Sequence, residues 1–425
     1  MPGLRVLASA FALALLVFPA AHGAFSAPDG SPSPSGRDVE TSSSTMVATP
    51  SESISRPLAS PGAEGASSSW TVQATRDLDP GLSLTTWIRA EPRPGRVWVV
   101  EWDPASSSLE PRPIVPPRRG GGGRGLATVS RLARDAGARV AINATYFGGR
   151  GQSLGLVRVD GDILSGPLLG RTAIAFGGGA KVPAIGRVAF GGSILLPDGA
   201  TLAVDGLNQP RSNEQVVVYN DRHGFRTGTA PAPVAEEWAI DASGHVVERA
   251  SADCNIPEGG WVLSAHGHAL EYLTPRLTLG QSVRFVPSLD RLLFPFPHAL
   301  GGGPRLVVQG RVQVGAVEER FRPDVARSMA PRTAVATTRR LTWLLVVAEG
   351  REVDAVGLSL EELAAFLVER GAEDALNFDG GGSSTLVVDD QVLNRPTDGQ
   401  ERPVANALGL VPASRGLLSR GAATP

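Results

Sequence analysis

Short runs of β-forming residues, each closed by Gly, Pro, Asn or Asp, recur along the chain and limit it to a sheet-rich fold. They lie at residues 97–100, 139–142, 215–219, 343–348 and 385–388. Two helices have clear end signals. One covers residues 128–136 and stops at Gly137. The other begins with a capping box of Ser359 and Glu362 and stops at Gly371. We therefore predict an α+β fold with a mixed β-sheet core and few helices.

The two ends of the chain differ in composition from its middle. Residues 1–24 carry Arg5, an apolar run and then small residues, which is typical of an export signal, although an uncleaved membrane anchor is the alternative. Residues 25–69 are rich in Ser, Pro and Gly and are predicted to be a disordered linker. A folded domain over residues 70–412 and a tail over 413–425 follow. Whether residues 70–94 belong to the core is left open. The predicted location is secreted or extracytoplasmic, with no stable membrane span.

Charge and cysteine content exclude several functions. The net charge is −2 and the pI is about 6.3, so the chain lacks the basic excess of a dedicated nucleic-acid binder. All 40 basic residues except Lys181 are arginine. Because Cys254 is the single cysteine, the chain has no internal disulfide and no cysteine-based zinc cluster.

Two segments repeat the same pattern of a helix, a glycine stop and a short buried strand. Residues 137–143 read GARVAIN and residues 371–377 read GAEDALN, and a glycine-rich turn follows each. Coincidence between two ordinary αβ units is one explanation. The other is an internal duplication, in which Asn143 and Asn377 are equivalent and the polar residues after each strand face one cleft.

A glycine-rich loop after the second of these strands is the most informative stretch. It places Asp379 at the end of an apolar strand, directly before Gly380, Gly381, Gly382 and Ser383. Consecutive glycines allow close backbone approach, and their N–H groups can form a concave anion site. A tight turn capped by Asp379 is the structural alternative.

Four further residues or pairs are compatible with an anionic substrate. Gly302 and Gly303 mark a second place where the backbone can approach a ligand. Arg332, Arg395 and Arg402 carry guanidinium groups suited to phosphate oxygens. Taken singly, each arginine is better explained as a solvated surface residue, and only the set together favours an anionic substrate.

Five segments of the chain resemble, in the same order, motifs of the phosphodiester glycosidase family. They read NATYFGG, ALGGGPRLVVQGRV, APRTAVA, GLSLEELAAFLVERGAEDALNFDGGGSSTLVV and NRPTDGQERPVANAL. The resemblance covers roughly residues 95–412 and is most specific over 295–412. One departure is Glu349-Gly350-Arg351, where Asp-Gly-Arg is frequent. The resemblance implies a hydrolase that releases a sugar such as N-acetylglucosamine from a phosphodiester-linked glycan or wall polymer.

The resemblance implies a catalytic cleft built from Asn143, Arg332, Asp379 and residues 380–383. Asp379 would act as the nucleophile or as the base that activates water, and Arg332 and the glycine amides would hold the phosphate. Asn143 would bind sugar hydroxyls or orient Asp379. A phosphate monoester is already a good leaving group, so one carboxylate is sufficient.

No cofactor and no catalytic metal site are predicted. A structural calcium ion held by Asp205, Asp389 and Asp390 is an open alternative, although their spacing matches no calcium loop. Two rival functions are a non-catalytic protein that binds exopolysaccharide or cell-wall glycan, and an esterase or amidase acting on a surface polymer.

Overall fold

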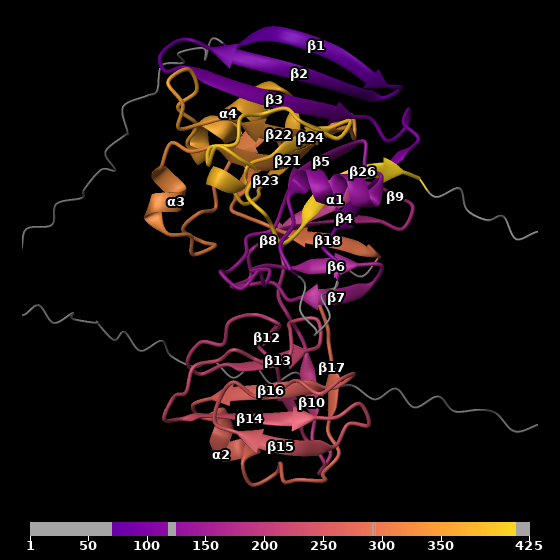
Figure 1. Ribbon diagram of the computed structural model, residues 1–425, viewed down its shortest axis with the longest axis vertical. Coiled ribbons are helices and arrows are strands. Elements are labelled where there is room, and N and C mark those ends of the chain that lie inside the picture. The colour runs from indigo at the N-terminus through magenta and orange to yellow at the C-terminus, as the bar shows by residue number, and fades with distance from the viewer. Residues whose placement is uncertain (1–69, 118–124, 291–292, 294, 414–425) are drawn as a thin grey trace, which may run out of the picture. The chain divides into compact units, whose positions relative to one another are not determined.

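The computed structural model describes residues 70–117, 125–290, 293 and 295–413. The predicted signal peptide, the linker and residues 414–425 of the tail lie outside the described residues. Strands dominate the described part (Figure 1), which confirms the sheet-rich prediction. The described residues contain four α-helices: α1 (Val129–Ala136), α2 (Ala269–Leu273), α3 (Pro323–Arg327) and α4 (Leu360–Glu369).

An eight-stranded antiparallel sheet is the largest element of the fold. Residues 70–94 belong to this sheet. They form its first two strands, which add to the sheet beside its third strand, and Trp70 packs edge-on against Phe366 of α4. In spatial order, its strands are β1 (Thr71–Asp79), β2 (Leu82–Arg89), β3 (Gly95–Trp102), β22 (Trp343–Ala348), β21 (Arg332–Thr338), β23 (Ala372–Asn377), β19 (Arg305–Val308) and β20 (Arg311–Val312).

Alternation along β22 gives this sheet two buried faces. Leu344 and Val346 pack against α4, whereas Leu345 and Val347 face a second core on the opposite side. This is the two-residue period of a strand. The helix α4 itself begins as predicted, because Ser359 and Glu362 form both hydrogen bonds of the capping box.

A five-stranded sheet shares the core on that opposite side. Ile142 and Leu408 of this sheet pack in the same buried cluster as Leu345, while Ala141 and Val387 on its other face pack against α1. The layers are therefore α4, large sheet, second sheet and α1. The strands of the second sheet are β25 (Gln391–Val392), β24 (Leu386–Val388), β5 (Val140–Asn143), β26 (Ala407–Pro412) and β4 (Leu109–Ile114).

A third sheet adds side chains to the same central core. Val157, Ile174 and Leu300 come from its strands and are buried with the residues of the two larger sheets. Its strands are β7 (Asp162–Ser165), β6 (Val157–Val159), β18 (His298–Gly301), β8 (Thr172–Gly177) and β9 (Ala180–Arg187).

The middle of the chain has hydrophobic cores of its own, which the sequence reading of one domain over residues 70–412 did not anticipate. Trp238 and Leu263 are buried there together with Leu273 of α2. One sheet consists of β12 (Gly206–Leu207), β13 (Val216–Asn220), β16 (Trp261–His266), β14 (Ala235–Ile240) and β15 (Val246–Ala250). A smaller one consists of β11 (Thr201–Ala203), β10 (Ser193–Leu195) and β17 (Arg284–Val286).

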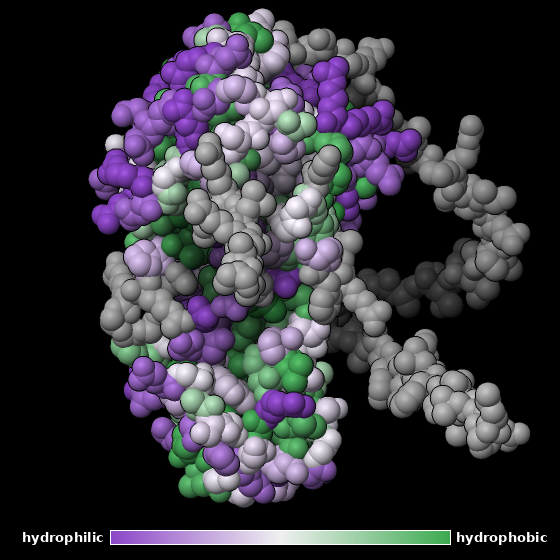
Figure 2. Space-filling view, turned by 90° about the vertical axis from the view of Figure 1, so that its right-hand side faces the viewer, coloured by the Kyte–Doolittle hydropathy of each residue, from purple (hydrophilic) through white to green (hydrophobic). Residues whose placement is uncertain are grey.

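Polar and apolar residues are mixed over the face drawn in Figure 2. The most exposed large apolar side chains include Val317 and Val353, which lie far apart in sequence. Within the described residues, no helix has the length and hydrophobicity needed to cross a membrane.

Candidate active site

The chain passes from the large sheet to the second sheet at Asp379. Immediately after β23, the amide of Phe378 donates to the Thr333 carbonyl on β21, at 2.8 Å. One residue later, the amide of Asp379 donates to the Ala144 carbonyl, which follows β5, at 2.9 Å. Asp379 is therefore fixed where the ends of two strands from different sheets meet.

Asn143, the last residue of β5, holds the backbone at this crossing. Its Nδ2 donates to the Asp379 carbonyl at 2.7 Å, and its Oδ1 accepts from the Thr333 hydroxyl at 2.8 Å and from the Thr385 amide at 3.1 Å. The residue is fully buried. Because both ends of the amide are bonded to protein, the geometry supports orientation of Asp379 and not contact with sugar hydroxyls.

Asn377 makes the matching contact in the opposite direction. Its Nδ2 donates to the hydroxyl of Tyr146, which follows β5, at 2.8 Å, and the Tyr146 hydroxyl donates to the Gly303 carbonyl at 3.0 Å. Each asparagine of the sequence echo thus contacts the segment that follows the other strand. The two strand ends converge as the echo suggested, while duplication itself stays a prediction.

Tyr146 is a site residue that sequence reasoning did not select, although it lies in the NATYFGG motif. Burial raises the pKa of its hydroxyl, and the negative charge of Asp379 adds to the rise, whereas Arg332 and Arg171 oppose it. These effects fall off with distance, so Tyr146 lies near the carboxylate and near both guanidinium groups. Its position three residues after Asn143 is the feature of the sequence that could have identified it as a site residue.

The Asp379 carboxylate is half-buried beside the glycine loop. Its Oδ1 accepts the amide of Gly380 at 3.0 Å. The Ser383 hydroxyl faces it outside standard hydrogen-bond geometry. Burial raises the pKa of Asp379 to about 6, although Ser383, Gly380 and Arg402 all favour the charged form. The carboxylate is therefore ionised at neutral pH, and it takes up a proton in mildly acidic solution.

The glycine loop is a short 3₁₀ turn, and the prediction of a nest of free amides is wrong for most of it. The Gly380 amide donates to Asp379, the Gly381 amide donates to the Pro331 carbonyl at 2.9 Å, and the Ser383 amide donates to the Gly380 carbonyl at 3.3 Å. These donors are already used within the protein, so they are not available to hold a phosphate.

Close packing explains why glycine occupies the loop. A Cβ atom at Gly380 would lie 2.8 Å from the Pro331 carbonyl oxygen, and one at Gly382 would collide with the guanidinium of Arg402. Gly381 has a φ of 61°, which a side chain would strain. The glycines therefore let the loop backbone pack closely against neighbouring protein atoms, and this packing explains them without a bound ligand.

Gly302 and Gly303 also serve packing rather than ligand approach. A Cβ atom at Gly302 would lie 2.5 Å from the Asn377 carbonyl oxygen, and one at Gly303 would collide with the Glu319 carboxylate. Both glycines are buried. They lie next to Asn377 and Tyr146, and so help to form the site without lining it for substrate.

Arg332 is buried at the start of β21, with 3% of its surface exposed. Its guanidinium donates to the carbonyls of Leu358 at 2.9 Å, Val325 at 3.1 Å and Ser328 at 2.6 Å. It makes no ion pair with a carboxylate among the described residues. Burial lowers its pKa, and the nearby charge of Arg351 contributes to that lowering. Its Nε and one Nη are thus used by backbone carbonyls, and its positive charge acts on the site by opposing the rise in the pKa of Tyr146.

Two more arginines lie beside the glycine loop. Arg402 pairs with Asp398 at 2.7 Å and favours the charged form of Asp379. The guanidinium of Arg351 lies 3.4 Å from the position of a Cβ atom at Gly381, and its side chain makes no hydrogen bond or ion pair with the described residues. Sequence reasoning noted Arg351 only as part of a motif variant and did not assign it to the site.

Arg395 belongs to a structural ion network instead. Its side chain bonds Glu349 at 3.0 Å and Asp354 at 2.6 Å, and Arg96 contacts the same two carboxylates. Glu349 is buried. Because the two carboxylates already neutralise the charge of Arg395, the structure does not support the predicted contact between Arg395 and phosphate.

The acids considered for calcium do not gather at one place. Asp205 accepts the amide of Val216 at 2.7 Å, and Asp389 pairs with Arg139. Among the described residues, no group of three or more His, Cys, Asp or Glu side chains is arranged to hold a metal ion.

Comparison with known proteins relates part of the chain to a known family. Residues 236–411 match the model of the phosphodiester glycosidase family. A 70-residue segment is 39% identical to N-acetylglucosamine-1-phosphodiester alpha-N-acetylglucosaminidase of the mouse. That alignment covers 16% of this chain and only 13% of the mouse protein.

Two solved structures share the fold over most of the chain. A hypothetical protein from Synechocystis has a TM-score of 0.69 at 26% identity, covering 78% of this chain and 62% of that one. A putative exported protein from Burkholderia pseudomallei has a TM-score of 0.60 at 23% identity, covering 75% of this chain and 74% of that one.

Proposed function

We propose that this protein is a phosphodiester glycosidase that hydrolyses a sugar-1-phosphodiester, with Asp379 as its catalytic carboxylate. The observation that carries the proposal is a half-buried carboxylate with a pKa of about 6 at the start of a glycine loop. Arg332 and Arg351 lie against that loop, and neither pairs with a described carboxylate. A functional carboxylate and an excess of positive charge are what cleavage beside a phosphate requires.

The reaction breaks the bond between the anomeric carbon and the phosphate oxygen. The electron pair stays on that oxygen, and the product is a phosphomonoester. Asp379 acts either by attacking the anomeric carbon, with water then releasing the sugar, or by taking a proton from the water that attacks. Both routes need the ionised carboxylate. Asn143 and the Gly380 amide keep it in place.

The guanidinium groups stabilise the charge that grows on the departing phosphate. Arg351 offers donors that no described residue uses, and Arg402 lies against Gly382 beside the same carboxylate. Arg332 lies deeper and contributes its field together with fixed hydrogen bonds. Charge-assisted hydrogen bonds from arginine to phosphate are strong and directional.

The finer parts of the proposal concern substrate and place. The sugar is N-acetylglucosamine-like and is linked to a surface glycan or wall polymer, by analogy with the reaction named for the mouse relative. The protein acts outside the cytoplasm after export through residues 1–24, whose composition is that of a signal peptide.

The test is the release of free sugar and phosphomonoester from a panel of sugar-1-phosphodiesters by wild type, Asp379→Asn and Arg395→Gln. We expect wild type and Arg395→Gln to release sugar and Asp379→Asn to release none. Release that survives Asp379→Asn would disprove the mechanism but keep the activity. Saturable glycan binding without release would favour the non-catalytic glycan-binding protein, and cleavage of simple esters or amides would favour the other rival.

A further inference from the structure

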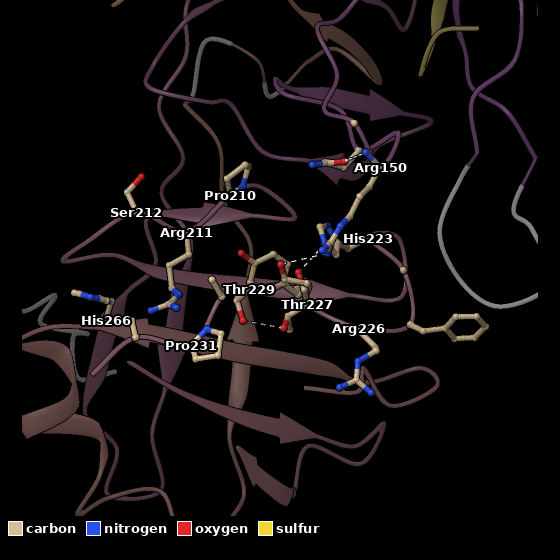
Figure 3. Close-up of a pocket in the computed structure, with 18 of the residues that line it drawn as sticks. Arg150, Pro210, Arg211, Ser212, His223, Arg226, Thr227, Thr229, Pro231 and His266 are labelled. Atoms are coloured by element: carbon tan, nitrogen blue, oxygen red, sulfur yellow. Dashed lines mark hydrogen bonds between the residues drawn. The ribbon is translucent and has the colours of Figure 1, made fainter. Parts of the chain in front are cut away.

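A cavity of about 810 Å³ lies in the middle part of the chain, and Asp379 is not among the residues that line it. Tyr219 on β13 and His266 on β16 form part of its wall, and loop residues form the rest. In Figure 3, Arg211 and His266 lie on one side, Arg150, His223 and Arg226 lie on the other, and Thr227 and Thr229 lie between them. The volume is within the usual range of about 300–1,000 Å³ for ligand pockets.

The lining has a marked charge imbalance. It contains Arg150, Arg211 and Arg226 but no aspartate or glutamate. Arg226 is neutralised outside the lining, since it pairs with Asp253 at 2.9 Å. Arg150 and Arg211 make no ion pair among the described residues. The cavity therefore holds two positive charges that the protein does not balance locally.

Most hydrogen-bond donors of these two arginines are also unused. A guanidinium has five N–H donors. Among the described residues, the guanidinium of Arg150 makes a single hydrogen bond, to the Gly228 carbonyl at 3.3 Å, and that of Arg211 makes a single one, to the Ala265 carbonyl at 3.0 Å. The Nε of Arg211 is buried with no partner. Buried donors normally have partners, so a bound group is expected to complete the Nε of Arg211, whereas Arg150 is exposed and its unused donors are open to solvent or to a ligand.

The other nearby titratable groups do not supply the missing negative charge. Glu214 bonds the exposed His268 at 2.7 Å and lies 3.9 Å from His266. Glu237 is fully buried and accepts hydrogen bonds from Thr227 and Thr229. Neither carboxylate lines the cavity: Glu237 lies behind Thr227 and Thr229 and has no ion pair among the described residues, whereas Arg150 and Arg211 are part of the lining itself.

The remaining lining suits a sugar. Phe225, which is 63% exposed, is the aromatic residue of the lining loop, while Gln152 and Ser212 add polar side chains. His223 donates from Nε2 to the Thr227 carbonyl at 3.1 Å, and burial lowers the pKa of its ring, which favours the neutral form. An aromatic face with neutral polar groups accommodates both the apolar face and the hydroxyls of a saccharide.

We propose that this cavity binds an anionic saccharide, whose phosphate or carboxylate group is held by Arg150 and Arg211. The site is distinct from the one at Asp379 and does not depend on the hydrolysis proposed there. The loop after β5 carries Tyr146 at one site and Arg150 at the other, four residues apart in the chain.

The test is calorimetric titration of the full chain carrying Asp379→Asn, so that no probe is consumed. The probes are glucose 6-phosphate, glucuronate, neutral glucose and inorganic phosphate. We expect one or both anionic sugars to bind, more weakly as salt rises, and glucose to bind at least tenfold more weakly. Binding of glucose 6-phosphate alone would identify a phosphate ligand, and binding of glucuronate alone a carboxylate ligand.

Variants in the same background decide where the sugar binds. Arg211→Gln and Arg150→Gln should each weaken binding about tenfold or more. The control Arg276→Gln removes an arginine that pairs with Asp198 and does not line the cavity, and it should change nothing. The proposal is wrong if neither anionic sugar binds, if both cavity variants bind like wild type, or if Arg351→Gln abolishes binding instead. Inorganic phosphate binding as tightly as glucose 6-phosphate would overturn the saccharide part.

Discussion

Replacing Asp379 with asparagine should make the protein more stable at neutral pH than the wild type, while removing activity. Burial lifts the pKa of this carboxyl from 3.8 to about 6. In the folded state, ionisation is therefore opposed, and the wild type loses stability as the pH rises from about 4 to about 6. The lost stability amounts to about 3 kcal/mol when complete, as an upper bound, because the half-buried side chain retains contact with water. Asparagine keeps an oxygen for the Gly380 amide and carries no charge.

Urea unfolding of both proteins at about pH 4.5 and about pH 7.5 measures this effect. The two pKa values give about 1 kcal/mol of the loss at the lower pH and about 3 kcal/mol at the higher. Relative to wild type, the variant should therefore gain about 2 kcal/mol in free energy of unfolding between the two conditions. An equal difference at both pH values would refute the conclusion that Asp379 is held in a site that opposes its charge.

Four substitutions and a change of pH have defined outcomes. Asn143→Ala leaves three buried hydrogen-bond partners unpaired and should destabilise the fold by about 3–5 kcal/mol, seen as a lower urea midpoint. Gly302→Ala places a Cβ atom 2.5 Å from a strand carbonyl and should cost about 1–3 kcal/mol or more by the same assay. Arg351→Gln should reduce kcat/KM for a phosphodiester at least tenfold without lowering stability. Arg395→Gln should lower stability and leave kcat/KM unchanged. In wild type, kcat/KM should rise as pH increases through about 6 and then level off, because Asp379 must be ionised; a profile that falls over this range would contradict its role.

Elements with short-range signals were predictable from the sequence. The capping box of Ser359 and Glu362 forms as expected, and Gly137 and Gly371 adopt the positive φ values that end their helices. These features depend on residues three or four positions apart, so the local sequence contains all the information needed. The short β-rich runs also became strands.

The partners of the polar side chains were less predictable. Arg395 was predicted to contact phosphate because a guanidinium suits phosphate oxygens and the residue lies just downstream of the glycine loop, yet Glu349 binds it from 46 positions away. The glycine-loop amides were expected to be free, but the acceptor for Gly381 is the carbonyl of Pro331, on the neighbouring strand connection. Such long-range partners are set by strand order, which the sequence pattern does not reveal.

The site itself was found through a mixture of both kinds of information. Asp379 was identified from the local sequence, because it follows an apolar strand and directly precedes three glycines. Tyr146 reaches it because two sheets meet at that point, and Arg351 reaches it because the turn after β22 lies against the glycine loop. The cores of the middle segment escaped notice because their strands read like those of the rest of the domain.

The most direct test of the central claim is which bond breaks. Hydrolysis of a sugar-1-phosphodiester in water enriched in heavy oxygen, followed by mass spectrometry of both products, locates the incoming oxygen. The proposed glycosidase chemistry predicts the label at the anomeric carbon of the released sugar and none in the phosphomonoester. Label in the phosphomonoester would mean attack at phosphorus, and would contradict the role assigned to Asp379.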